Sequence, residues 1–189
     1  LYNTVDAVIV GRFVGKAALA SVGGSAAVLT YQVVMFFTSL ANGASVIISQ
    51  FYGAGNKRML HRALHTAFAF SVIVSILISI LGYAATPWLL SIMNTPADIM
   101  NDSVLYLRIY FLGIISTLIY NIGSGIMRAV GDSKRPLYYL IICCIINIIL
   151  DLVFVICFDM GIAGAAVATI IAQTVSAVLV IRALMTSYD

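Results

Sequence analysis

The sequence predicts an all-α integral membrane protein with six transmembrane helices. Of its 189 residues, 62% are hydrophobic and only 9% are charged, whereas an ordinary globular domain has about 25% charged residues. Several stretches without Asp, Glu, Lys or Arg are about as long as, or longer than, the roughly 20 residues that a helix needs to cross the hydrocarbon core of a bilayer. These stretches are residues 25–56, 63–97, 109–127 and 160–181.

Two more apolar segments, around residues 5–14 and 137–158, complete the set of six. The first helix has only about 15 residues, too few for a full span. We therefore interpret that helix as truncated and the chain as an excerpt of a longer protein. The six helices are expected at about residues 1–15, 25–50, 63–92, 102–128, 137–158 and 161–183.

Turn sequences separate the predicted helices. Gly23-Gly24, residues 53–56 and residues 131–136 are rich in Gly, Asn, Asp and Ser. Pro136 suits the first position of the fifth helix, where its missing N–H costs nothing. Because no polar linker interrupts the chain, residues 1–189 are expected to form one domain.

Charges in the predicted loops set the orientation of the helices. Seven of the ten cations fall on one side of the membrane, against Arg12, Lys16 and Arg108 on the other. Cytoplasmic loops carry the excess of Lys and Arg, so both chain ends are expected on the cytoplasmic side of a plasma (inner) membrane. Each basic cluster has three residues or fewer and flanks a span, which argues against nucleic acid as a partner. The seven cations are Lys57, Arg58, Arg62, Arg128, Lys134, Arg135 and Arg182.

Asp151 is the only charged residue between Arg135 and Asp159, in a segment apolar enough to lie inside a bilayer. A charged side chain near the bilayer centre costs at least about 2.5 to 3.5 kcal/mol. Such a residue normally faces a cavity or a partner and marks a path for ions or protons. The sequence therefore indicates part of a transporter.

Three other polar residues are predicted at nearly the depth of Asp151. Asn147 lies four residues before it, so the two share a helix face. Asp151 and Thr169 lie roughly 10 Å from the outer ends of their helices, and Asp6 lies slightly deeper. Two carboxylates, an amide and a hydroxyl suit either a hard cation such as sodium or a carboxylate pair that holds a proton. These four residues are the candidate cation- or proton-binding site, with Na+ or H+ as the coupling ion.

Each of these residues also has a structural interpretation. Thr169 follows a run of small residues suited to close helix packing, Asn147 can tie helices together, and Asp6 can lie at the membrane interface. Asp151 is the hardest to explain structurally. Other residues inside the spans can either line a substrate cavity or hold helices together. They are Gln32, Asn42, Gln50, Tyr106, Tyr110 and Asn121.

The sequence contains no pattern typical of an enzyme, and no catalytic residue or cofactor is assigned. The three cysteines, at positions 143, 144 and 157, share one predicted helix and are expected to pack there. His61 and His65 are four residues apart but lack the Glu of a zinc hydrolase motif. Neither a nucleophile elbow nor a Walker phosphate loop is present, so ATP-driven transport is not indicated.

Several motifs occur in a specific order along the chain. The opening helix and turn contain Val5-Asp6-Ala7-Val8-Ile9-Val10-Gly11-Arg12 and Ala17-Ala18-Leu19-Ala20-Ser21-Val22-Gly23. Gly43-Ala44-Ser45, Ser49-Gln50-Phe51-Tyr52-Gly53-Ala54-Gly55 and Arg128-Ala129-Val130-Gly131-Asp132-Ser133-Lys134-Arg135-Pro136 follow. The last two are Asn147-Ile148-Ile149-Leu150-Asp151 and Gly161-Ile162-Ala163-Gly164-Ala165-Ala166-Val167-Ala168-Thr169. This ordered set resembles the N-terminal six-helix lobe of multidrug and toxic compound extrusion (MATE) transporters, and the Asp151 match points to the DinF-like branch.

The resemblance implies a fold and a function. MATE proteins have twelve helices in two six-helix lobes, and they exchange sodium or protons for organic cations and other drugs by alternating access. The resemblance implies that Asp6, Asn147, Asp151 and Thr169 form the cation site of the N-terminal lobe, with Asn121 nearby. It also implies cationic or amphipathic small-molecule substrates and a C-terminal lobe in the same chain.

Two other functions stay open. A lipid-linked precursor flippase of the same superfamily should favour a more cationic cavity than these spans offer. A non-transporting membrane scaffold would leave Asp151 unexplained.

Overall fold

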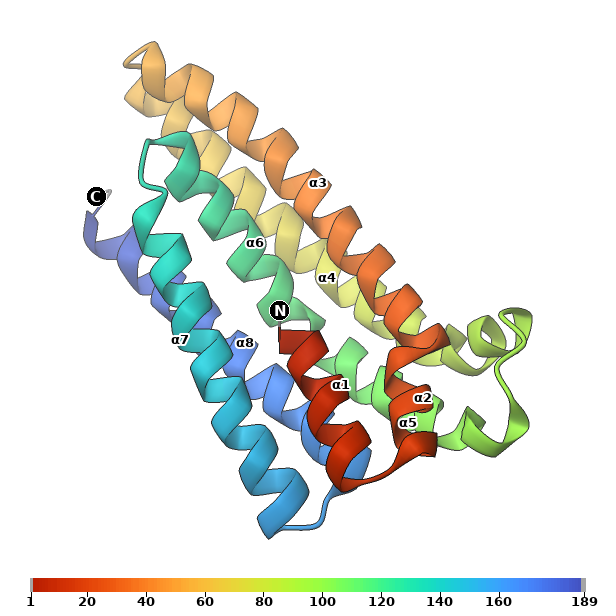
Figure 1. The fold of residues 1–189 in the computed structure, drawn as a ribbon. Helices are drawn as coiled ribbons and strands as arrows, with labels where there is room; N and C mark the ends of the chain where they lie inside the picture. The colour runs from red at the N-terminus through yellow and green to blue at the C-terminus, as the bar shows by residue number, and fades with distance from the viewer. Residues whose placement is uncertain (1, 188–189) are drawn as a thin grey trace.

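The computed structural model describes residues 2–187 and is almost entirely helical (Figure 1). No strand occurs in this part of the chain, so the predicted all-α class is confirmed. The elements in order are α1 (Tyr2–Phe13), α2 (Lys16–Gly23), α3 (Ser25–Gly53), α4 (Lys57–Ile92), α5 (Ala97–Leu112), α6 (Ile114–Ala129), α7 (Lys134–Asp151), the π-helix η1 (Leu152–Cys157) and α8 (Gly161–Ser187).

These elements group into the six predicted segments. Four helical stretches are long and apolar enough to cross a membrane: residues 16–53, 57–92, 134–157 and 161–186. Together, α5 and α6 are also long and apolar enough for a fifth span, with a bend of 49° between them. The remaining segment is α1, whose 12 residues fall short of the roughly 20 that a full span requires.

Two local features differ from the sequence prediction. Residues 16–23, predicted as a connection, form the short helix α2 between Gly15 and Gly24. Ala18 and Val22 of α2 are buried, and the helix contacts α1, α3 and α5. Alanine and leucine favour a helix, and the backbone at Gly15, with φ of 132°, separates α2 from α1 in a conformation that glycine tolerates best.

The second difference concerns residues 102–128, which were predicted to form one helix. The structure begins this segment at Ala97 and divides it at Gly113. A Cβ atom at Gly113 would clash with the side chain of Ile170 on α8. Because Gly113 has no side chain, α8 can approach the bend closely. The neighbouring residues in the sequence do not predict this contact.

Helix α6 is the centre of the bundle, in contact with α3, α4, α5, α7 and α8. Its buried face includes Ile114, Leu118, Ile122 and Ile126, each separated by about one turn. Gly125 lets α3 come close, because a Cβ there would lie 2.6 Å from the Ser45 hydroxyl oxygen. Around this centre, α3 and α4 run side by side as a long hairpin (Figure 1).

Helices α1, α7 and α8 form a second group within the bundle. Helix α7 packs along α8, and α1 contacts α7, η1 and α8 (Figure 1). Asp159 and Gly161, with φ of 52° and 54°, reverse the chain between η1 and α8. The start of α8 is rich in small residues, and Ala165, Ala166 and Ala168 are fully buried. These small side chains permit the close approach that places polar residues of three helices together.

Candidate cation-binding site

The four residues predicted as a cation or proton site meet between α1, α7 and α8. Asp6 comes from the middle of α1, Asn147 and Asp151 from the last turns of α7, and Thr169 from the third turn of α8. The Thr169 hydroxyl donates a hydrogen bond of 2.7 Å to Asp6 Oδ2. The Asn147 amide donates to the same hydroxyl over 3.3 Å. Three separate helices are thus joined through one hydroxyl group.

Asp151 completes the cluster from the turn of α7 after Asn147. Its carboxyl group lies close enough to that of Asp6 for the two to interact. Neither oxygen of Asp151 receives a hydrogen bond from the described part of the chain. Two carboxylates that face each other have only acceptor atoms to offer, so both can be charged only when a cation lies with them.

Burial makes this arrangement costly unless a positive charge is present. The relative exposure is 0% for Asp6, Asn147 and Asp151 and 1% for Thr169. Within residues 2–187, Asp6 Oδ1, Asn147 Oδ1 and both Asp151 oxygens are buried acceptors without a partner. Each unsatisfied buried group costs about 1–3 kcal/mol, and charged groups cost more. A bound cation, or a proton shared by the carboxylates, would remove most of this penalty.

The donor set indicates which cation fits. All four partnerless atoms are oxygens, the ligands that hard cations prefer, whereas zinc and copper favour imidazole and thiolate. The described residues contain no group of three or more His, Cys, Asp or Glu side chains that could hold a metal. Two carboxylates, an amide and a hydroxyl in one cluster have the chemistry to hold either a hard cation or a proton.

The π-helix η1 begins directly after Asp151, in a run of apolar residues that carries no sequence signal for it. Its wider turn appears in the hydrogen bond from the Phe158 N–H to the Val153 carbonyl, five residues earlier. Short π-helical segments are uncommon and frequently occur at functional sites. The change from α-helix to π-helix thus lies next to Asp151, the only charged residue between Arg135 and Asp159.

The other predicted polar and aromatic residues come from α3, α5 and α6. Asn121 on α6 is half-buried, donates to the Thr117 carbonyl over 2.8 Å and accepts a 3.5 Å hydrogen bond from Thr38 on α3. Tyr106 and Tyr110 are buried in α5 with stacked rings, their centroids 6.5 Å apart. The remaining three are exposed on α3: Gln32, Asn42 and Gln50.

A bundle of long apolar helices that encloses a buried polar cluster is characteristic of an integral membrane protein. The MatE family model matches residues 1–153. The chain therefore belongs to the MatE family, which confirms the resemblance found in its motifs.

Two curated relatives come from Bacillus subtilis (strain 168). The probable multidrug resistance protein YoeA is 32% identical over 181 residues, which are 94% of this chain and 39% of YoeA. The probable multidrug resistance protein YpnP is 32% identical over 176 residues, with coverage of 93% and 39%. A crystal structure of MATE in the bent conformation aligns with a TM-score of 0.93 at 26% identity, covering 100% of this chain and 42% of that one. The chain thus spans about two fifths of the length of these proteins.

Proposed function

We propose that this chain is the N-terminal six-helix lobe of a secondary active antiporter that exports organic cations and other drugs in exchange for sodium or protons. Membership of the MatE family and the naming of YoeA and YpnP as probable multidrug resistance proteins support an efflux function. The chain covers 42% of a MATE crystal structure, which agrees with one lobe of two.

The observation that carries this proposal is the meeting of Asp6, Asn147, Asp151 and Thr169 in a buried cluster with four partnerless oxygens. A bound cation would hold α1 against α7 and α8 by neutralising the two carboxylates. Its release would leave like charges close together and favour a different arrangement of α1. Coupling to transport requires only that the two arrangements differ in cation affinity.

Sodium is the favoured coupling ion, because a proton alone needs neither the Asn147 amide nor the Thr169 hydroxyl. The exposed polar residues Gln32, Asn42 and Gln50 on α3 are proposed to line the substrate cavity with the second lobe. Asn121, Tyr106 and Tyr110 would support that cavity from α6 and α5.

The proposed exchange predicts gradient-driven transport by the full-length protein in proteoliposomes. Efflux of the fluorescent organic cation ethidium should follow an inward sodium gradient at equal pH on both sides. A matched potassium gradient serves as the control for osmotic and diffusion effects. If efflux does not depend on sodium but follows a pH gradient, the coupling ion is a proton held by Asp6 and Asp151. A scaffold would show no gradient-driven efflux at all.

The proposed orientation places both ends of the chain in the cytoplasm. Single cysteines at Asn56 and Ser133, in a background without native cysteines, should react with a membrane-impermeant maleimide only from the cytoplasmic side. A cysteine at Asp98 should react only from outside. All three positions are exposed. A cysteine that does not react therefore lies on the side of the membrane that the maleimide cannot reach. Intact cells and inverted vesicles provide the comparison, and reversed labelling would contradict the orientation.

A further inference from the structure

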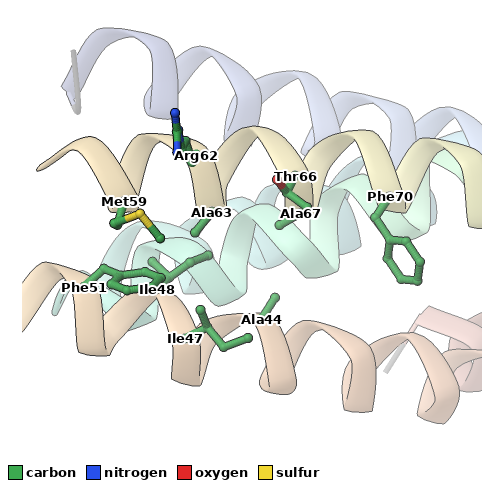
Figure 2. A pocket seen from close by; sticks show the side chains of 10 residues that line it. All are labelled: Ala44, Ile47, Ile48, Phe51, Met59, Arg62, Ala63, Thr66, Ala67 and Phe70. Atoms are coloured by element: carbon green, nitrogen blue, oxygen red, sulfur yellow. The ribbon is translucent and has the colours of Figure 1, made fainter. Parts of the chain in front are cut away.

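A groove of about 340 Å³ lies between α3 and α4, near the turn that joins them (Figure 2). Its walls are apolar except for Arg62 and Thr66. Figure 2 shows Met59, Ala63 and Ala67 on α4 across from Phe51 and Ile47 on α3. The volume falls within the usual range of small-ligand sites, about 300–1,000 Å³.

Small side chains explain why the two helices leave space here. Ala44 on α3 and both Ala63 and Ala67 on α4 contribute only a methyl group to the walls. Ile47 and Phe70, which also line the groove, are about half exposed. The groove therefore opens at the surface of the bundle. None of the four residues of the candidate cation site lines it.

The end of the groove near the turn is strongly basic. Lys57, Arg58 and Arg62 lie within the first two turns of α4, and all three are exposed. No Asp or Glu occurs in residues 7–97. Among residues 2–187, the only ion pair joins Arg135 to Asp132, so none of these three cations has an acidic partner there. Arg62 projects from α4 away from α3, at the edge of the groove (Figure 2).

We propose that this groove binds an anionic phospholipid. The phosphate contacts Arg62, with Lys57 and Arg58 close by, and one acyl chain lies along the apolar wall between α3 and α4. Basic pockets between transmembrane helices bind acidic headgroups on the cytoplasmic side of membranes, where anionic lipids are concentrated. A long arginine keeps its stem on apolar surface while its guanidinium reaches the headgroup layer. This lipid site is independent of the cation site.

Photocrosslinking of the full-length protein in phosphatidylcholine nanodiscs tests the proposal. The probes are phosphatidylglycerol and phosphatidylcholine with the same diazirine-bearing acyl chain, and peptide mass spectrometry locates the adducts. One basic side chain near the headgroups contributes about a fivefold preference for an anionic lipid. Phosphatidylglycerol should therefore label the groove peptides several-fold more than phosphatidylcholine does. Arg62→Gln should lower that ratio about fivefold, whereas Arg62→Lys should retain most of it.

Two control variants separate this site from general charge effects and from ion coupling. Lys134→Gln removes an exposed cation on α7 that does not line the groove, so it should leave the ratio unchanged. Asp151→Asn should also leave it unchanged. Equal labelling by both probes in the wild-type protein would overturn the proposal. Labelling elsewhere on the protein but not in the groove would overturn it too, because the second lobe or another copy would then cover these residues.

Discussion

Asp151→Asn in the full-length protein should abolish cation-driven efflux while leaving the helical bundle folded. The carboxyl group is completely buried and neither of its oxygens has a partner in residues 2–187. Asparagine has nearly the same size but removes the negative charge that, together with Asp6, attracts a cation. Because an unpaired buried charge destabilises the folded state, its removal should not lower the melting temperature.

Ethidium efflux from proteoliposomes under an imposed ion gradient measures this effect. The rate in the variant should fall to that seen without a gradient. Asp98→Asn is the matched control, because Asp98 is exposed in the first turn of α5 and lies outside the cluster. If Asp151→Asn retained the wild-type efflux rate, the cluster would have no role in coupling. Asp6→Asn should behave like Asp151→Asn.

Thr169→Val should separate sodium coupling from proton coupling. The hydroxyl donates to Asp6 Oδ2 and receives a hydrogen bond from the Asn147 amide. Valine preserves the shape but removes both a neutral oxygen ligand and the contact that joins α1 to α8. Hydrogen bonds to charged groups contribute about 1.5–3 kcal/mol, so the sodium concentration for half-maximal efflux should rise about tenfold or more.

The matched control for this second prediction is Thr169→Ser, which retains the hydroxyl and should stay near the wild-type sodium dependence. Sodium titration of efflux at constant pH gives the comparison. If Thr169→Val left the sodium dependence unchanged, the hydroxyl would not be a ligand. Efflux in Thr169→Val that still followed a pH gradient would favour a carboxylate pair that holds only a proton.

The placement of the candidate site was predictable from the sequence because helices are regular. Asn147 and Asp151 share a face by their spacing of four, and a rise of about 1.5 Å per residue gave the depth of Asp6 and Thr169 from the predicted helix ends. The structure joins these residues by hydrogen bonds and burial. What they bind stays a prediction.

Other features depend on contacts that local patterns do not contain. The bend at Gly113 accompanies the close approach of Ile170, which is distant in sequence. Helix α2 owes its position to contacts with α1 and α5. The π-helix after Asp151 lies within a uniformly apolar run whose composition suits an α-helix equally well. The α3–α4 groove likewise depends on three alanines that face one another only after the hairpin forms.

The hydrogen bond between Asp6 and Thr169 spans 163 residues of sequence, and this separation has a consequence for biosynthesis. During translation, α1 leaves the ribosome long before α7 and α8 exist. Its carboxyl group must therefore enter the membrane region without the groups that later surround it, at a cost of about 2.5–3.5 kcal/mol for a charged Asp. Helix α1 is thus less stable in the membrane until α7 and α8 have been inserted. The packing of the lobe is complete only when Thr169 on α8 contacts Asp6.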